Sequence, residues 1–169
     1  MSQLRELRNN RLLDMRILAV DPGEKRIGLA ISDPTSTIAN PLGVLNHISR
    51  VLDAAQIAAL AGEHGAGLIL VGATTDEDDQ LTLQGRSAAR LAAAIRAQTP
   101  LPVELWDESG STQAARQASI ALGVSGHKRR RQSHGHLDEL AATYILQTYL
   151  DSHPSQPGSG RRAPPAEAP

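Results

Sequence analysis

The residues whose types and spacing could do chemistry are four carboxylates from three distant parts of the chain. Asp21 directly follows the apolar run ILAV, Asp107 and Glu108 directly follow VELW, and Asp138 lies in the segment HLDELAATYILQTYL. Carboxylate oxygens are the ligands that Mg²⁺ and Mn²⁺ prefer, and the chain has no Cys and no His at liganding spacing. Two such ions can activate a water and stabilise a leaving oxygen, so the acids favour a Mg²⁺ or Mn²⁺ site for phosphoryl chemistry.

Two of these acids also have an ordinary structural interpretation. An Asp before Pro22 and Gly23 is common in turns, and Pro-Gly favours a type II turn with Gly23 at the position of positive φ. Asp138 could be one of the acids that are favoured in the first turn of a helix. The chemical interpretation therefore depends on whether the fold brings the acids together.

The apolar pattern predicts an α/β domain in which helices separate buried strands. The continuous runs ILAV and LILV are typical of central strands that are covered on both faces. Between them, Leu52, Ile57 and Leu60 have largely helical spacing, so a parallel strand pair is expected. The expected strands are residues 17–20, 27–32, 40–46, 68–71 and 103–106. The expected helices are residues 51–64, 81–97, 113–122 and 136–150.

This arrangement would place the acids at one edge of the sheet. The carboxyl ends of parallel strands lie along the same edge, and ligands bind outside it, so Asp21 and the pair Asp107 and Glu108 are expected there. Asp138 shares a helical face with Ala141, Ala142 and Ile145, the stripe that should pack on the sheet. Gly28, inside the second strand, indicates a bulge or a close approach to the backbone.

Two basic segments could hold a polyanion beside the acids. Lys25 and Arg26 follow Asp21 closely, and a four-residue basic run precedes the last helix. The overall composition carries no sign of nucleic-acid binding, because 17 Lys and Arg face 18 Asp and Glu, and aromatic residues make up only 2% of the chain. Phosphate contacts must therefore be local, and a solvated loop is the alternative for both segments. The run consists of Lys128, Arg129, Arg130 and Arg131.

The composition along the chain suggests one folded domain with two polar ends. Residues 1–14 read as a flexible N-terminal extension, residues 15–151 as the domain, and residues 152–169, rich in Pro, Gly and Ser, as a disordered tail. No apolar run approaches the roughly 18 residues of a membrane span, and the Arg-rich start lacks the apolar segment of a signal peptide. We therefore expect a soluble cytoplasmic protein with no membrane partner.

Three motifs resemble the signatures of the YqgF/RuvX family of RNase H-like nucleases. They are DPGEKRIGLAISDP, WDESGSTQAAR and HLDELAATYILQTYLD, in the family's order and within residues 15–151. The resemblance implies an RNase H-like α/β fold, with a five-stranded mixed sheet flanked by α-helices, and a divalent-metal site. It also implies hydrolysis of phosphodiester bonds at the 5′ end of the 16S ribosomal RNA precursor. Carried over residue by residue, the family's acids are Asp21, the pair Asp107 and Glu108 with Glu108 the preferred ligand, and Asp138.

The chain departs from the family pattern in two places. Ser109 stands where the family usually has an Arg after the acidic pair, so a phosphate-positioning cation is missing or comes from the run 128–131. The fourth strand is followed by an acidic loop, residues 76–79 (DEDD), in place of the common Gly-x-Pro pattern. Such a loop would repel a phosphate backbone, which bears on the substrate groove more than on the metal site. Its alternative interpretation is a solvated loop.

The sequence is also compatible with other functions. An actin-like ATPase also begins with an Asp-x-Gly hairpin, but the chain has no second hairpin and no room for a second domain. The acids could also survive in a nucleic-acid-binding maturation factor that no longer catalyses. Within the nuclease interpretation, the substrate could be structured RNA such as pre-rRNA or a branched DNA junction. The protein could be a monomer or a homodimer, and a two-fold dimer would favour the junction.

Overall fold

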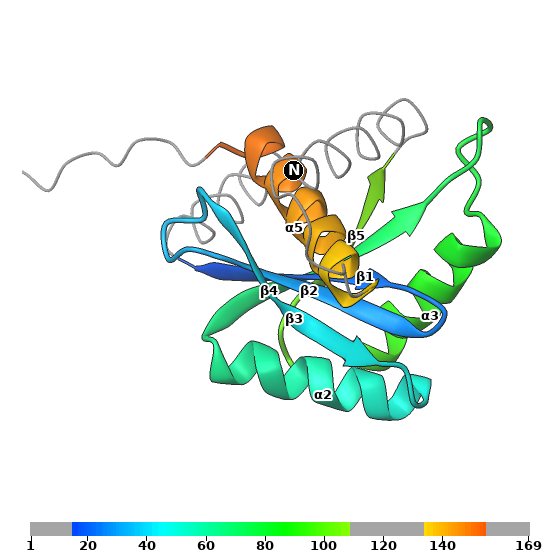
Figure 1. The fold of residues 1–169 in the computed structure, drawn as a ribbon, viewed down its shortest axis with the longest axis horizontal. Coiled ribbons are helices and arrows are strands. Elements are labelled where there is room, and N and C mark those ends of the chain that lie inside the picture. Colours follow the sequence, from blue (N-terminus) through cyan, green and yellow to red (C-terminus); the bar gives the residue numbers. More distant parts are fainter. Residues whose placement is uncertain (1–14, 109–133, 155–169) are drawn as a thin grey trace, which may run out of the picture.

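Five strands form one mixed sheet in the order β3-β2-β1-β4-β5 (Figure 1). The computed structural model describes residues 15–108 and 134–154. The strands are β1 (Arg16–Pro22), β2 (Arg26–Ser32), β3 (Ala39–Asn46), β4 (Ala66–Thr74) and β5 (Val103–Glu108). β2 pairs antiparallel with β1 and β3, whereas β4 pairs parallel with β1 and β5. The expected five-stranded mixed sheet is therefore confirmed.

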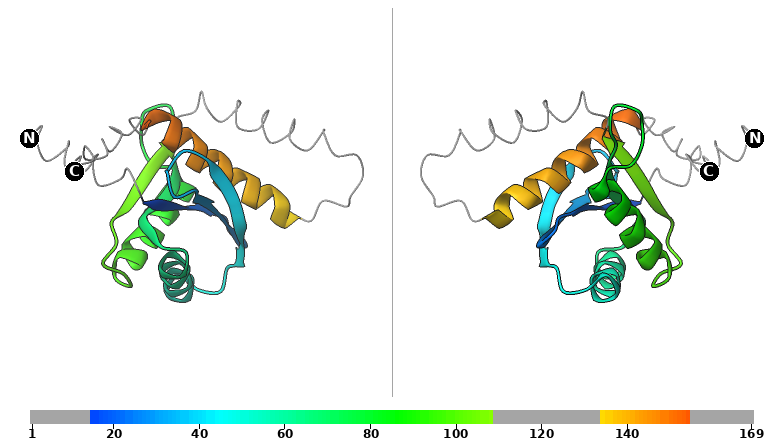
Figure 2. Two further views of the ribbon diagram at one scale, coloured as in Figure 1. Left: turned by 90° about the vertical axis from the view of Figure 1, so that its left-hand side faces the viewer. Right: turned by 90° about the vertical axis from the view of Figure 1, so that its right-hand side faces the viewer.

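Helices cover both faces of this sheet. Helix α5 (His134–Ser152) lies across one face, and α2 (Arg50–Glu63) and α3 (Leu83–Arg96) lie on the other (Figure 2). These helices match three of the four expected from the sequence. The helix expected at residues 113–122 lies outside the described residues, as do the predicted extension and most of the predicted tail. Within the described ranges, no helix is long and apolar enough to cross a membrane.

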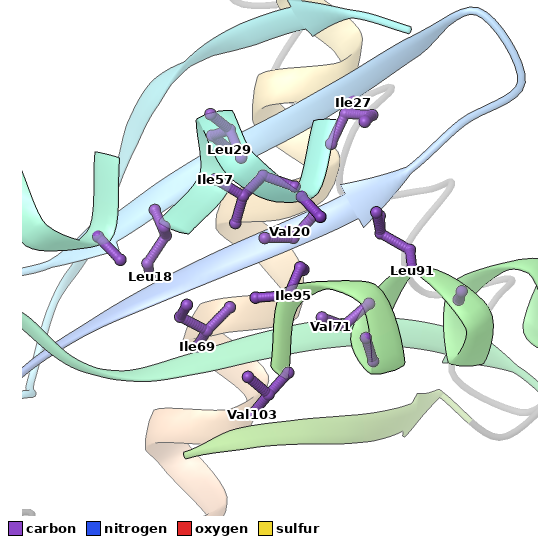
Figure 3. Packing of buried hydrophobic residues seen from close by; sticks show 14 of the residues in the cluster. Leu18, Val20, Ile27, Leu29, Ile57, Ile69, Val71, Leu91, Ile95 and Val103 are labelled. Carbon is purple, nitrogen blue, oxygen red and sulfur yellow. The ribbon is translucent and has the colours of Figure 1, made fainter. Parts of the chain in front are cut away.

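Alternate residues of the two central strands belong to two separate hydrophobic clusters. Strand side chains point to opposite faces in turn, so a continuous apolar run can serve both layers. The cluster on the α5 face contains Ile17, Ala19, Leu68 and Leu70. The cluster on the face of α2 and α3 contains Leu18, Val20, Ile69 and Val71, which Figure 3 shows packed against residues of both helices. Because β1 and β4 are buried on both faces, packing fixes the ends of these strands, including the end of β1 that carries Asp21.

The β1–β2 hairpin closes differently from the sequence prediction. A type II turn needs positive φ at Gly23, and among the described glycines only Gly65 has positive φ (65°). The predicted type II turn is therefore wrong. Instead, the Gly23 amide donates a hydrogen bond to the Arg26 carbonyl (2.9 Å), and a Cβ on Gly23 would lie 2.4 Å from that oxygen. Glycine is required here by close approach, and Glu24 and Lys25 form the tip.

Helix α2 buries a different face from the one its apolar pattern suggests. Ile57 is buried as expected, but Leu52 is 51% exposed and Asp53 is 1% exposed. Asp53 turns inward because its carboxylate accepts hydrogen bonds from the His47 ring and from the Ile48 amide, which compensates its burial. Ser49 caps the helix by accepting from the Leu52 amide.

Candidate functional site

Two of the predicted acids lie on either side of one glycine. Asp21 is the cross-strand partner of Gly28 in the β1–β2 ladder. A Cβ on Gly28 would lie 2.1 Å from the backbone oxygen of Asp138, so the first turns of α5 rest directly on β2 at this point. In β1, Asp21 follows Ile17 and Ala19 at intervals of two residues, and both of these face α5, so position 21 is also on the α5 side of the sheet. The fold thus places Asp21 and the backbone of Asp138 next to the same glycine, on the side of the sheet that carries α5.

Further contacts fix where α5 sits along the sheet. Ala141, Ala142 and Ile145 are buried, as expected for the face shared with Asp138. A Cβ on Gly72 of β4 would lie 2.7 Å from Ile145 Cδ1, so a second glycine also allows close approach. Gln147 anchors the helix to the start of β3, because its side chain accepts from the Ala39 amide (3.0 Å). These contacts together set the position of Asp138.

Farther along α5, an aromatic cluster attaches the helix to the edge strand. The Trp106 and Tyr149 rings meet edge to face with centroids 5.1 Å apart, and the His153 ring stacks on Tyr149 at 4.3 Å. The Tyr149 hydroxyl also donates to the Glu104 carboxylate at 3.3 Å. Because Trp106 belongs to the cluster on the α5 face, the alternation of β5 is clear: Trp106 lies on the side of α5 and Asp107 on the other.

Asp138 already has a cationic partner. The Arg26 Nε donates to Asp138 Oδ2 at 3.1 Å, and both side chains are about one-third exposed (36% and 33%). Arg26 was predicted as a nucleic-acid contact, and the structure places it against the predicted metal ligand. An exposed pair of this kind contributes about 0–1 kcal/mol to stability, so it orients the carboxylate without holding it strongly. Lys25, at the tip of the same hairpin, is exposed.

The two acids of the predicted pair have different surroundings. Asp107 is exposed, and its Oδ1 accepts a hydrogen bond from Thr75 Oγ1 at 2.8 Å. Sequence reasoning missed this partner, since Thr75 is separated from Asp107 by a whole helix. Glu108 pairs through its backbone with Thr74 at the end of β5, and its side chain lies outside the described part of the structure. The hydrogen bond from Thr75 therefore gives Asp107 a structural role, because it links the end of β5 to the segment that follows β4.

A divalent cation is compatible with the donor set that the described residues offer. Asp21 and Asp138 supply hard oxygen ligands at one point of the sheet. Among the residues described, no group of three His, Cys, Asp or Glu side chains is close enough to hold a metal. The third acid predicted for such a site, Glu108, is not among the described side chains.

Of the remaining predicted site features, two lie outside the described residues and one lies within them. The basic run 128–131 and Ser109 lie outside the described residues. The acidic loop 76–79 is described, and it is ordered by its own first residue: Asp76 Oδ1 accepts from the amides of Asp78 (3.0 Å) and Gln80 (2.9 Å). This hydrogen bonding agrees with the alternative interpretation of a solvated loop.

Comparison with known proteins gives a consistent family. A family model named RuvX and described as "Holliday junction resolvase" matches residues 15–152. A protein of Thermoanaerobacter pseudethanolicus named "Putative pre-16S rRNA nuclease" is 35% identical over 138 residues, which cover 82% of this chain and 97% of that protein. A protein of Geobacillus kaustophilus with the same name is 37% identical over 140 residues, covering 82% and 99%.

Solved structures confirm the fold at low sequence identity. The RuvC protein of Thermus thermophilus superimposes with a TM-score of 0.52 at 15% identity, covering 82% of this chain and 96% of that one. T. thermophilus RuvC in complex with a Holliday junction substrate gives a TM-score of 0.51 at 17% identity, covering 82% and 97%. The RNase H-like architecture expected from the sequence motifs is confirmed.

Proposed function

The chain belongs to the RuvX family, and from this membership we propose that it is a divalent-metal-dependent nuclease that trims the 5′ end of the 16S rRNA precursor. The nuclease class follows from the family. The RNA substrate is taken from the names of the curated relatives, which are 31–37% identical to this chain. Such a role in ribosome biogenesis would place the protein in the cytoplasm.

The observation that carries the proposal is the meeting of Asp21 and Asp138 at Gly28. Two carboxylates at one point of the sheet repel each other, and a cation bound between them removes this repulsion. Arg26 compensates Asp138 in part, and a bound divalent cation would compensate both acids. When bound, Mg²⁺ or Mn²⁺ would supply an activated water and stabilisation of the leaving oxygen.

We assign the third carboxylate to Glu108 rather than to Asp107. Strand positions alternate between faces, and Trp106 belongs to the cluster on the α5 face, so position 108 falls on the face that carries α5 and position 21. Asp107 occupies the opposite alternation and is held by Thr75. In this assignment Asp21, Glu108 and Asp138 hold the ion, and Asp107 positions the end of β5.

Phosphate contacts would come from the cations of the two basic segments. Lys25 stands at the tip of the hairpin beside Asp21, and we propose that it contacts the backbone of the substrate together with the basic run 128–131. Arg26 would serve both as the partner of Asp138 and as a cation near the scissile phosphate. These contacts carry no sequence information, so substrate choice must come from shape.

A cleavage assay tests this proposal. The pure full-length chain would be incubated with a 5′-extended 16S rRNA fragment, linear DNA and a four-way DNA junction, each with Mg²⁺, with Mn²⁺ and with EDTA. We expect metal-dependent cleavage of the RNA, loss of cleavage in Asp21→Asn, and unchanged cleavage in Asp78→Asn, which removes an acid of the loop instead. Preferred cleavage of the junction would show that the protein resolves DNA junctions and does not process RNA. Binding without cleavage under every condition would show that the protein is a nucleic-acid-binding maturation factor and not an enzyme.

A further inference from the structure

A cavity of about 380 Å³ opens beside the β1–β2 hairpin, on the face opposite Asp138. Its walls come from the hairpin, the end of β3, and helices α2 and α3. Ile27 and Leu91, which Figure 3 shows among the packed residues of the hydrophobic cluster on this face, form part of its lining. A volume of this size falls in the range of small-molecule sites, which are about 300–1,000 Å³, and an apolar floor with a few polar groups is their usual character.

One polar wall of the cavity is built around a buried acid. Asp53 is 1% exposed, and its carboxylate accepts hydrogen bonds from the His47 Nδ1 and from the Ile48 amide (3.1 Å). A carboxylate only accepts, so Nδ1 carries the proton of this bond and Nε2 is left for another partner. The His47 amide also donates to the Lys25 carbonyl at 2.9 Å, which holds His47 against the hairpin. The His47 ring is thus held in place, and it lines a cavity that is separate from the acid site.

Donors and an acceptor stand on different walls. Arg50, the first residue of α2, lines the cavity beside His47, and its guanidinium makes no hydrogen bond or ion pair with any residue in the described ranges. Ser87 adds a hydroxyl from α3. Glu24, on the hairpin wall, contributes a carboxylate that accepts hydrogen bonds. These groups suit a ligand that carries an anion at one end and hydroxyl donors at the other.

We propose that this cavity binds a ribonucleotide. Its phosphate would lie against Arg50 and His47, its base or sugar would cover the apolar floor, and its ribose hydroxyls would donate to Glu24. The nucleotide could be free in solution or part of an RNA strand, since both carry the same phosphate and ribose. The site is separate from the acid edge, because Asp21 faces the α5 side and the cavity lies on the other face. Binding here therefore does not depend on catalysis.

Isothermal titration of the full-length chain tests the site, with EDTA present so that the acid edge binds no metal. The probes are adenosine 5′-monophosphate, its 2′-deoxy form, inorganic phosphate and an adenosine trinucleotide. We expect saturable binding of the ribonucleotide, weakened about tenfold or more in Arg50→Gln, because hydrogen bonds to charged groups are the strong ones. Arg16→Gln, which removes a cation at the far end of β1, should bind as the native chain does.

The other probes determine the chemical class of the ligand and whether it is a free nucleotide or part of an RNA strand. Weaker binding of the deoxy form, with the difference reduced in Glu24→Gln, supports the ribose contact, whereas equal binding of the two forms overturns it. Inorganic phosphate that binds as tightly as the nucleotide would make this a bare anion site and overturn the proposal. Binding of the trinucleotide alone, with the same sensitivity to Arg50→Gln, supports the strand as the source. No saturable binding of any of the three nucleotide probes, or equal losses in Arg50→Gln and Arg16→Gln, overturns the inference.

Discussion

The backbone oxygen of Asp138 lies so close to Gly28 that a Cβ on this glycine would approach it to 2.1 Å. Real Cβ atoms do not come so near to a backbone oxygen, so any larger residue at position 28 must push α5 away from β2. Because Gly28 is also the cross-strand partner of Asp21, the same contact sets the separation of the two acids. A position without a side chain thus controls the geometry of the candidate metal site.

Gly28→Ala should lower both stability and activity. Moving backbone is costly, and overpacking of this kind typically costs about 1–3 kcal/mol in the free energy of unfolding. Displacement of α5 should also separate Asp138 from Asp21, so cleavage at saturating metal should fall by more than the unfolded fraction explains. Urea unfolding and cleavage by the same preparation measure the two effects.

Gly43→Ala is the matched control for this change. Gly43 lies in the neighbouring strand β3, a Cβ there would meet nothing within 4 Å, and its φ is not positive. The substitution should therefore leave cleavage unchanged and unfolding nearly so. If Gly28→Ala were as well tolerated as Gly43→Ala, the contact with Asp138 would not control the site.

Glu108→Gln should abolish cleavage, whereas Asp107→Asn should reduce it only modestly. The amide of Gln keeps the shape of Glu but removes a ligand charge, and losing one carboxylate from a metal site weakens both binding and catalysis. In Asp107→Asn the amide group can still accept the hydrogen bond from Thr75 through its oxygen, so the end of β5 stays in place. Cleavage rates at several Mn²⁺ concentrations separate lost metal affinity from lost turnover.

Thr75→Val further distinguishes the structural role of Asp107 from the metal-binding role of Glu108. It removes the hydroxyl that contacts Asp107 without touching any acid, so it should resemble Asp107→Asn in cleavage. The reverse ranking, with Asp107→Asn inactive and Glu108→Gln active, would show that Asp107, and not Glu108, is the metal ligand.

Much of this fold could be predicted because its signals are local. The continuous apolar runs identify β1 and β4, and glycine inside β2 indicates the close approach that the contact with Asp138 then explains. The strand-end acids follow from the same reasoning, because they stand next to those runs in the chain. What sequence reasoning could predict was therefore the scaffold and the position of its acids along the strands.

The partners of those acids could not be predicted, because they depend on contacts between distant segments. Arg26 and Asp138 are separated by 112 positions, and Thr75 and Asp107 by 32, and no spacing rule links them. The inward turn of Asp53 also overrides the apolar pattern of α2, since two hydrogen bonds offset the burial of its charge. Its one local signal was a His six residues earlier, which a sequence pattern does not distinguish from a surface residue.

Acid should destabilise the protein through Asp33 in the turn between β2 and β3. Partial burial raises the pKa of Asp33, but hydrogen bonds from the Ile38, Thr37 and Thr35 amides and the Thr35 hydroxyl outweigh it and lower the pKa from 3.8 to about 2. A lowered folded-state pKa stabilises the fold above the unfolded value, and this contribution is lost as the pH falls from about 3.8 to about 2. Urea unfolding across this range should show the loss.

Asp33→Asn should flatten part of this acid dependence, because the amide does not titrate. It should also be less stable than the native chain at neutral pH, since an uncharged acceptor makes weaker hydrogen bonds. Asp78→Asn is the control, because the Asp78 carboxylate accepts no hydrogen bond from the residues that the structure describes. Identical acid profiles for Asp33→Asn and the native chain would assign the loss to other carboxylates.

Divalent metal should stabilise the native chain more than Asp138→Asn. A ligand that binds only the folded state raises the apparent free energy of unfolding, so millimolar Mn²⁺ should raise the melting temperature, and loss of a ligand should shrink the rise. Arg26→Gln tests the competition for the same carboxylate: without its cation, Asp138 is repelled more by Asp21 and gains more from Mn²⁺. The expected order of the Mn²⁺ shifts is Arg26→Gln, then the native chain and Asp78→Asn together, then Asp138→Asn. Equal shifts in the native chain and in Asp138→Asn would remove Asp138 from the metal site and leave its pairing with Arg26 as a structural contact.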